Sequence, residues 1–299
     1  MAEIIVDDVV KEFDGVIAVN HVSLKMEEGL YGLLGTNGAG KTTLMRMLCT
    51  VVQPTSGSIY YESERISEMG ARYRDKIGYL PQEYGYYPDF TVVNYLKYMS
   101  TLKGLPKRIS DKKIDELLAI VSLEKHSMKK MRDLSGGMKR RVGIAQAMLN
   151  DPEVIILDEP TIGLDPMERI RFKNLIASLA ENKTVLLSSH IVSDLETIAS
   201  EIFVMKEGEI VNQGTVDDIC KQVPVKVWIC KVDNAEAERI IADNDRCIVN
   251  VRKEGNLSEI RVVSERKPHH NAMLTEVSLE DAFFYQFGVQ EDIECLDTN

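Results

Sequence analysis

The chain has 299 residues, 44% of them hydrophobic, which suits one large domain with a smaller one or two domains of medium size. Its 36 basic and 47 acidic residues give a formal net charge of −11, so the lysine and arginine excess that a nucleic acid backbone attracts is missing and no nucleic acid partner is expected. No apolar stretch approaches the ~20 residues of a membrane-spanning helix, so we expect a soluble protein with at most a peripheral membrane role. The five cysteines have no C-x-x-C spacing and indicate neither a zinc site nor a disulfide framework.

Strand and helix patterns alternate through the first two thirds of the chain. β-Branched and apolar runs predict strands at residues 4–10, 22–26, 30–34, 57–61, 77–80, 154–157, 184–189 and 202–205. Apolar residues at helical spacing predict helices at residues 42–49, 93–103, 112–121, 137–149 and 167–180. The alternation predicts an α/β domain with a mainly parallel core sheet, and the first strands predict an antiparallel β subdomain. The mostly helical stretch from about 83 to 132 is interpreted as an inserted subdomain.

The character of the sequence changes after Gly214. Further strands are predicted at residues 225–232, 246–251 and 257–264, and a helix at 235–242. Ser278 and Asp281 have the spacing of a capping box that opens a last helix. We therefore predict a large domain over residues 1–216 and a small α+β domain, with an accessory or regulatory role, over residues 217–299.

A glycine-rich loop follows the strand predicted at residues 30–34. It reads G-T-N-G-A-G-K-T and fits the phosphate-binding motif G-x-x-x-x-G-K-[ST]. Its backbone amides would bind phosphate at the start of the next helix, Lys41 would reach the β- and γ-phosphates, and the Thr42 hydroxyl would ligate Mg²⁺. The alternative is a glycine-rich turn whose lysine is only solvated. The predicted nucleotide-binding residues of this segment are Gly35, Thr36, Asn37, Gly38, Ala39, Gly40, Lys41, Thr42 and Thr43.

Two acidic residues end the apolar strand predicted at residues 154–157. Asp158 is predicted as a Mg²⁺ ligand, directly or through water, and Glu159 as a general base that polarises an attacking water. Because ligands of parallel sheets bind beyond the carboxyl ends of the strands, both acids should face the phosphate loop. The alternative is an acidic strand end beside a turn at Pro160.

A second candidate anion site lies in the sequence L-S-G-G-M at residues 134–138. Ser135 is a good N-cap for the following helix, and Gly136 and Gly137 free the next amides to approach a phosphate. One chain has no evident need for two separate sites that bind a γ-phosphate. Two copies arranged head to tail would use both, because the L-S-G-G-M segment of each copy would contact the nucleotide held by the phosphate loop of the other.

The order of these motifs resembles the ABC ATPase family over residues 1 to about 216. The motifs are G-T-N-G-A-G-K-T-T, Gln82, L-S-G-G-M, V-I-I-L-D-E-P, G-L-D ending at Asp165, and S-S-H ending at His190. The resemblance implies that Gln82 touches Mg²⁺ or the attacking water and senses a membrane partner, and that Asp165 lies at a dimer seam. It also implies that the serine and glycines of L-S-G-G-M contact the γ-phosphate on the opposing copy. His190 would contact the γ-phosphate and hold Glu159 and water in place.

Two positions depart from the family pattern. Met138 stands where the signature usually has glutamine; drug- and antibiotic-export relatives tolerate this change, so hydrolysis is still expected. Phe13 stands where the adenine-stacking residue is usually tyrosine, and a phenyl ring keeps the stacking face. Val19 is predicted as a weaker neighbouring contact. The alternative for Phe13 is a core aromatic.

Several tyrosines follow Gln82, in a region where the family docks the coupling helix of its membrane partner. They are Tyr84, Tyr86, Tyr87, Tyr95 and Tyr98. Aromatic residues are favoured at interfaces. For Tyr95 and Tyr98, however, we expect a place in the core of the helical subdomain.

The resemblance implies an ATPase that uses ATP and Mg²⁺ and works as a homodimer or paired cassette. Its permease would be a separate chain, and the protein would sit at the cytoplasmic face of the cell membrane. The C-terminal V-S-L-E-D-A-F-F-Y-Q-F-G resembles the closing helix of ATPases that drive ABC-2-type exporters, which favours export. Three alternatives stay open: an importer motor, a soluble ABC ATPase that acts on the ribosome or DNA, and a regulatory module that binds ATP without steady hydrolysis.

Overall fold

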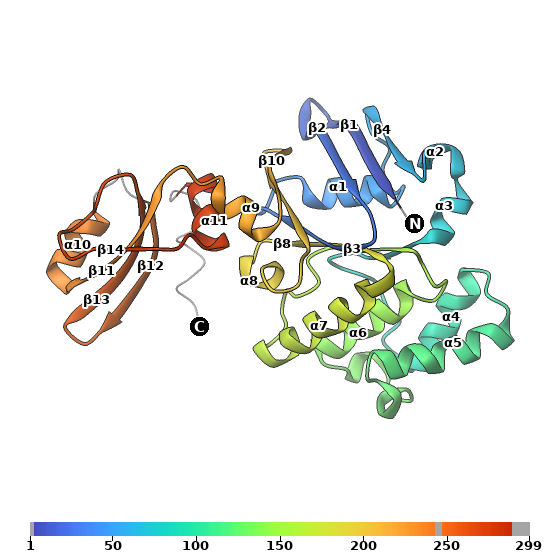
Figure 1. Cartoon of the computed structure of the whole chain (residues 1–299). Helices are drawn as coiled ribbons and strands as arrows, with labels where there is room; N and C mark the ends of the chain where they lie inside the picture. Colours follow the sequence, from blue (N-terminus) through green and yellow to red (C-terminus); the bar gives the residue numbers. More distant parts are fainter. Residues whose placement is uncertain (1–2, 243–246, 289–299) are drawn as a thin grey trace. The chain divides into compact units, whose positions relative to one another are not determined.

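The computed structural model describes residues 3–242 and 247–288, and the chain divides after Asn212 into two compact units. The division lies four residues before the predicted boundary at residue 216, within the strand β10 (Glu209–Gly214). Each unit is described by itself (Figure 1).

A six-stranded sheet forms the centre of the first unit, in the order β10-β9-β3-β8-β7-β6. Besides β10, its strands are β3 (Gly29–Leu34), β6 (Ile77–Leu80), β7 (Val154–Leu157), β8 (Thr184–Ser189) and β9 (Glu201–Lys206). The neighbours from β9 to β6 are parallel. Every residue of β7 and β8 is buried, as their unbroken apolar runs predicted.

A second, antiparallel sheet has the order β2-β1-β4-β5. Its strands are β1 (Ile4–Phe13), β2 (Val16–Met26), β4 (Ser56–Tyr61) and β5 (Glu64–Arg65). Helix α1 (Lys41–Leu48) packs into one core cluster with both sheets, to which Val6, Leu33, Leu44 and Ile156 each contribute a buried side chain. Through this shared core, the start of α1 is fixed relative to the ends of the parallel strands.

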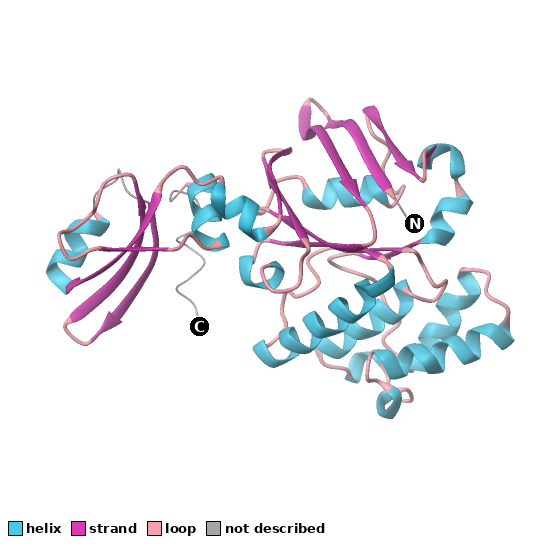
Figure 2. Cartoon of the chain, in the orientation of Figure 1, coloured by secondary structure: helices cyan, strands magenta, loops and turns pink. Residues whose placement is uncertain are grey.

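Most of the remaining helices cover the side of the parallel sheet that faces away from α1 (Figures 1 and 2). They are α4 (Val92–Leu102), α5 (Lys107–Ile120), η1 (Glu124–His126), η2 (Met131–Asp133), α6 (Gly136–Ala147), α7 (Pro166–Leu179), η3 (Ala180–Asn182) and α8 (Val192–Leu195), while the short α2 (Ile66–Met69) and α3 (Ala71–Lys76) follow β5. Residues 83–132 contain no named strand, in agreement with the predicted helical insert. Helix α5 begins five residues before the predicted start at 112, because Pro106 has a φ suited to a helix N-terminus.

The second unit is an antiparallel sheet with helices, in the strand order β12-β13-β11-β14. Its elements are α9 (Val216–Lys221), β11 (Lys226–Asp233), α10 (Asn234–Ile241), β12 (Cys247–Glu254), β13 (Leu257–Ser264), β14 (Met273–Thr275) and α11 (Leu279–Phe287). Cys230, Ile240 and Ile260 belong to its own core. Ser278 and Asp281 form the predicted capping box of α11.

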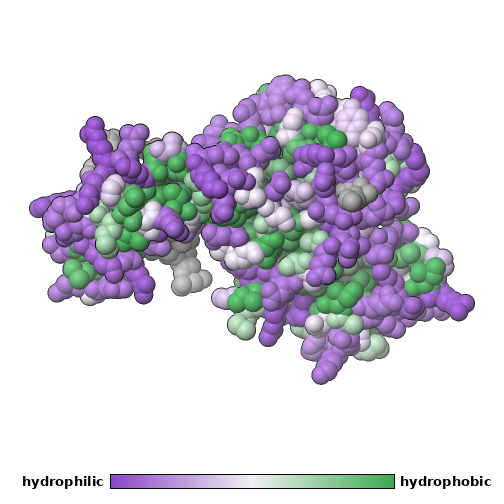
Figure 3. All heavy atoms as spheres, viewed as in Figure 1, coloured by the Kyte–Doolittle hydropathy of each residue, from purple (hydrophilic) through white to green (hydrophobic). Residues whose placement is uncertain are grey.

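Within the described ranges, no helix has the length and apolar character to cross a membrane. The face drawn in Figure 3 is mostly hydrophilic, with apolar residues in small groups, as the high content of charged residues leads one to expect.

Candidate functional site

The parallel sheet brings most of the predicted residues to one edge. Leu34 at the end of β3 lies beside Ser189 of β8, and Leu157 at the end of β7 lies beside Leu187 of β8 and Leu80 of β6. The segments that leave these strand ends carry the phosphate loop, the histidine, the two acids and the glutamine. Ligands of parallel sheets bind at this edge.

The phosphate loop closes over its own lysine. The Lys41 Nζ donates hydrogen bonds to the carbonyl oxygens of Gly35 at 2.6 Å and Thr36 at 3.0 Å. Gly40, the N-cap of α1, has a φ of +102°, and a Cβ there would lie 2.3 Å from the Ala18 carbonyl oxygen, so only glycine fits. The first amides of α1 have no acceptor within the helix. The loop therefore offers amides and an ammonium group together, as an anion site requires.

The remaining residues of the loop differ in exposure. Asn37 and Gly38 are exposed, Thr42 and Thr43 are half-buried, and Ala39 belongs to the core. The exposed and half-buried ones are accessible to a ligand.

Glu159 lies between a lysine and a histidine. Its Oε1 is 3.2 Å from the Lys41 Nζ, and its Oε2 is 3.0 Å from the His190 Nδ1. Burial raises the pKa of the Glu159 carboxyl, but the hydrogen bond with His190 and the charge of Lys41 outweigh burial, so the pKa is lower than the ordinary value. Glu159 is therefore ionised near neutral pH. Because an ionised carboxylate only accepts, the His190 Nδ1 donates and leaves Nε2 as the other ring atom for a ligand.

Asp158 is fully buried at the end of β7 and is held by a serine that sequence reasoning missed. The Ser188 Oγ donates to the Asp158 Oδ1 at 2.8 Å and accepts from the Glu159 amide at 2.8 Å. The Asp158 Oδ2 is buried and has no hydrogen-bond partner among the described residues. A buried carboxylate oxygen without a partner fits a hard cation such as Mg²⁺. The signal for Ser188 was its hydroxyl directly after the apolar run at residues 185–187, at the carboxyl end of β8.

The backbone of Glu159 is in a strained conformation, with a φ of +44°. Left-handed backbone at a residue other than glycine occurs where the surroundings enforce it, often at functional sites. Here the amide hydrogen bond to Ser188 is one such constraint. The strain turns the chain sharply after β7 and leaves the carboxylate between Lys41 and His190.

The second candidate anion site opens helix α6. The Ser135 Oγ caps the helix by accepting from the Met138 amide at 3.2 Å, as predicted. A Cβ on Gly137 would lie 2.6 Å from the Glu168 Oε2, and the same carboxylate oxygen is 3.3 Å from Arg141. Glycine thus lets α6 pack closely against the start of α7.

The two candidate anion sites belong to different sides of the molecule. Helix α1 lies on one side of the parallel sheet and α6 on the other (Figure 1). No hydrogen bond or ion pair in the described part of the chain joins residues 135–137 to the phosphate loop. Asp165 caps α7 by accepting from the Glu168 amide at 2.8 Å, on the same side as α6.

The predicted adenine contacts lie at the end of the antiparallel sheet. Phe13 is the last residue of β1, and the residue is 45% exposed, so the alternative of a core aromatic is wrong. The Lys11 Nζ lies 4.8 Å from the ring centroid. Val19 is fully buried in the core cluster. This corrects the prediction for Val19, because a side chain enclosed by core residues offers no surface to a ligand.

Gln82 is exposed in the loop between β6 and α4, and its neighbours contact the helix that carries the second anion site. Arg140 of α6 donates to the Pro81 carbonyl oxygen at 3.3 Å, and the Tyr84 hydroxyl donates to the Lys139 carbonyl oxygen. The glutamine loop and α6 are thus connected directly. These contacts join residues far apart in sequence, so no local sequence pattern could predict them.

An exposed aromatic cluster follows the glutamine loop. It consists of Tyr87, Phe90 and Tyr98, whose ring centroids are 5.0 to 5.9 Å apart. Tyr98 is 36% exposed, so the prediction of a core position for it is wrong, whereas Tyr95 is buried and donates to the Gln146 Oε1 at 2.5 Å. Residues three apart lie only about 60° apart around a helix axis, so the spacing alone does not separate the two tyrosines; Tyr95 contacts Gln146 of α6, whereas the ring of Tyr98 packs on the exposed Tyr87.

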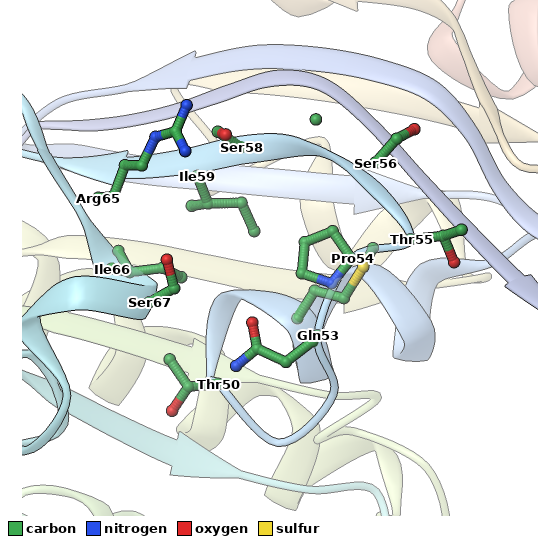
Figure 4. Close-up of a pocket in the computed structure, with 12 residues that line it drawn as sticks. Thr50, Gln53, Pro54, Thr55, Ser56, Ser58, Ile59, Arg65, Ile66 and Ser67 are labelled. Atoms are coloured by element: carbon green, nitrogen blue, oxygen red, sulfur yellow. The ribbon is translucent and has the colours of Figure 1, made fainter.

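A cavity of about 150 Å³ lies away from these residues, between β4 and the loop that follows α1 (Figure 4). Thr55, Ser56, Ser58 and Arg65 are among its lining residues. None of the predicted nucleotide-binding residues lines it, so it is not the candidate site.

Comparison with known proteins identifies relatives over the first unit. The sequence profile described as "ABC transporter" matches residues 19–162. The chain is 36% identical over 211 residues to the Nod factor export ATP-binding protein I of Cupriavidus pinatubonensis, with 70% of this chain and 65% of that protein covered. It is 38% identical to the uncharacterized ABC transporter ATP-binding protein YxlF of Bacillus subtilis, with 72% of each covered. It is 37% identical to the bacitracin transport ATP-binding protein BcrA of Bacillus licheniformis, with 72% and 70% covered.

A solved structure shares the fold of the first unit. The dimeric bacterial ABC transporter cassette MJ0796 superimposes with a TM-score of 0.65 at 26% identity, and the match covers 71% of this chain and 98% of the cassette. The comparison supports the α/β cassette architecture with a mainly parallel sheet, an antiparallel subdomain and helices.

Proposed function

Because the chain belongs to the ABC transporter family as an ATP-binding protein, we propose that it hydrolyses ATP to drive export through a permease on a separate chain. The observation that carries the proposal is the sheet edge, where an ionised glutamate lies between the phosphate-loop lysine and a histidine. An anion-binding loop beside an ionised base is what cleavage of a phosphoanhydride by water requires.

ATP would bind with its phosphates in the loop. The α1 amides and the Lys41 ammonium would hold the β- and γ-phosphates, and the exposed ring of Phe13 would stack on the adenine. Asp158, Thr42 and Gln82 would hold Mg²⁺, which when bound neutralises charge on the β- and γ-phosphate oxygens. The buried, unpartnered Asp158 oxygen supports this assignment.

Hydrolysis would use the pair formed by Glu159 and His190. The Glu159 carboxylate accepts a proton from water as the water oxygen bonds to the γ-phosphorus and the bond to the bridging oxygen of ADP breaks. Nδ1 of His190 is engaged with Glu159, so Nε2 would contact the γ-phosphate. Lys41 would counter the charge that develops on the phosphate oxygens.

Two cassettes would close around two nucleotides. Ser135, Gly136 and Gly137 lie on the far side of the sheet from α1, so we assign them to the γ-phosphate of the opposing copy, with Asp165 at the seam. The dimeric structure of the related cassette supports the pairing of two copies. A closed pair would then transmit its motion to the permease, and hydrolysis would reopen it.

The assignment predicts a selective effect of Ser135→Ala. Introduced into a Glu159→Gln chain, it should abolish ATP-driven dimerisation at concentrations at which Glu159→Gln alone is dimeric, while ATP still binds the monomer. Light scattering after size exclusion measures the dimer, and a fluorescent ATP analogue measures binding. The matched control is Ser278→Ala, which removes another serine N-cap, in the second unit, and should keep the dimer. Dimers of equal stability in both variants would contradict the assignment.

The exposed aromatic cluster is the proposed contact with the permease. Tyr87 and Tyr98 present rings in the region after Gln82, and aromatic side chains are favoured at interfaces. The relative named for Nod factor export supports the export direction. The protein would therefore work at the cytoplasmic face of the membrane.

The test is recovery of the permease with the tagged chain. Purified from native membranes in mild detergent, the chain should bring along one integral membrane protein in a fixed ratio, identified by mass spectrometry. Tyr87→Glu should lose this partner while the purified chain keeps its ATPase rate, and Leu257→Glu, an exposed apolar position in the second unit, should keep it. Stimulation of ATPase by ribosomes or DNA without a membrane partner would overturn the transport proposal.

A further inference from the structure

A buried polar cluster lies next to the proposed hydrolytic pair. The Thr161 Oγ1 donates to the Asp194 Oδ2 at 2.6 Å, and both side chains are almost completely buried. The Arg169 Nε is 3.8 Å from the Asp194 Oδ1. Three separate segments therefore meet at one carboxylate.

The cluster joins the same two segments as the hydrolytic pair. Thr161 is two residues after Glu159, and Asp194, in α8, is four residues after His190. The Glu159–His190 contact and the Thr161–Asp194 hydrogen bond are therefore successive cross-links between the chain that leaves β7 and the chain that leaves β8.

Helix α7 holds α8 through a second contact as well. The Lys173 Nζ donates to the Ser193 carbonyl oxygen at 3.0 Å, one turn along α7 from Arg169. Arg169, Lys173 and Asp194 also line a cavity of about 310 Å³. The position of α8, and with it the chain just after His190, is thus set by α7, the helix that Asp165 caps.

Stability alone gives a poor account of this cluster. A buried carboxylate loses its hydration, and buried ion pairs can often be replaced by apolar residues without loss of stability. The Asp194 Oδ1 and the Arg169 Nε each lack a hydrogen bond in the part of the chain that is described, so the pairing is not optimised. A buried carboxylate and its polar partners do, however, keep their contacts only in one arrangement of the chain segments that carry them.

We propose that Asp194, through Thr161 and Arg169, is a positioning residue that keeps the Glu159 carboxylate and the His190 imidazole in register for hydrolysis. The strained backbone of Glu159 is then constrained on both sides, by Ser188 at its amide and by the Thr161 hydrogen bond two residues later. The inference rests on the proposed roles of Glu159 and His190.

The test compares two substitutions of one residue. Thr161→Val keeps the shape but removes the hydroxyl, and Thr161→Ser keeps the hydroxyl. We expect Thr161→Val to lower kcat about tenfold or more while KM for ATP changes less than about twofold, because loss of a hydrogen bond to a charged group misplaces the base without touching the nucleotide. Thr161→Ser should restore kcat to within about threefold of the parent, since the same hydrogen bond forms. Steady-state phosphate release over a range of ATP concentrations measures both constants.

Asp194→Leu provides a second variant, which has a similar shape and no acceptor for the Thr161 hydroxyl. It should lower kcat in the same way, and the double variant with Thr161→Val should be no slower than the worse single one, because both changes break the same hydrogen bond. The matched control is Thr184→Val, which removes a buried threonine hydroxyl bonded to the Glu27 carbonyl oxygen at the opposite end of β8. It should leave kcat unchanged.

Three outcomes would overturn the proposal: a parental kcat in Thr161→Val, equal losses in Thr161→Val and Thr161→Ser, or additive losses in the double variant. Thermal midpoints of all variants separate a folding defect from a kinetic one. Failure of the proposed function is recognised separately, because Glu159→Gln would then hydrolyse ATP at the parental rate whatever the Thr161 variants do.

Discussion

Replacing Glu159 with glutamine is expected to lower kcat for ATP hydrolysis by about 10²- to 10⁴-fold, the range that a general base contributes. Glutamine keeps one oxygen, which can accept from Lys41 or from His190 but not from both, and it cannot take a proton from water. Because the pKa of Glu159 lies below its ordinary value, the base is ionised throughout the neutral range, and the substitution removes a negative charge that is present there. Protonation of Glu159 should therefore lower the parental rate only at pH values below the ordinary pKa of a glutamate.

ATP binding should survive the same change, and an ATP-bound dimer should accumulate. Phosphate release measures the rate, and light scattering with and without ATP measures the dimer. The control is Glu153→Gln, which alters the glutamate just before β7, at the opposite edge of the sheet, where it pairs with Lys76. It should keep the parental rate. Parental hydrolysis by Glu159→Gln would show that another group activates the water.

Replacing Lys41 with alanine is expected to weaken ATP binding by about 10- to 100-fold or more, since each charge-assisted hydrogen bond is worth about 1.5–3 kcal/mol and 1.4 kcal/mol corresponds to a factor of ten. The substitution removes the ammonium that would meet the phosphates. It also removes the donor that ties the carbonyl oxygens of Gly35 and Thr36 together, so the loop loses its internal support. Glu159 loses its nearest cation.

Titration with a fluorescent ATP analogue and isothermal calorimetry measure this affinity. Lys183→Ala is the matched control, because the Lys183 Nζ likewise donates to a backbone carbonyl, that of Pro152 at 2.6 Å, and pairs with Asp151. It lies before β8, away from the phosphate loop, and should leave the ATP affinity unchanged while it reduces stability. Equal affinities of Lys41→Ala and the parent would remove the loop from the proposed site.

Elements with a strong local pattern were predicted to the residue. β6, β7 and β8 have the predicted bounds, because runs of apolar and β-branched residues enclosed by polar ones mark strands buried on both faces. Strands with a weak local pattern were not predicted. β5 has two charged residues, and β14 has three residues at the edge of its sheet, so their pairing depends on the neighbouring strand rather than on their own sequence.

Side-chain exposure was the other source of error. Val19 and Tyr98 were assigned from family position and residue type, yet Val19 lies in the core and Tyr98 on the surface. Both residues fit either environment chemically. Which one they occupy depends on the strands and helices that pack against them.

The sequence by itself determined the family, the fold class and the residues at the ends of the parallel strands. It could do so because a glycine loop, an acidic strand end and a capped glycine pair each have a local chemical pattern, and parallel strands place their carboxyl ends together. Only the tertiary structure decided that Ser188 holds Asp158 and that Asp194 bonds Thr161. These partners are 30 and 33 residues apart in sequence, and folding alone brings them within hydrogen-bond distance.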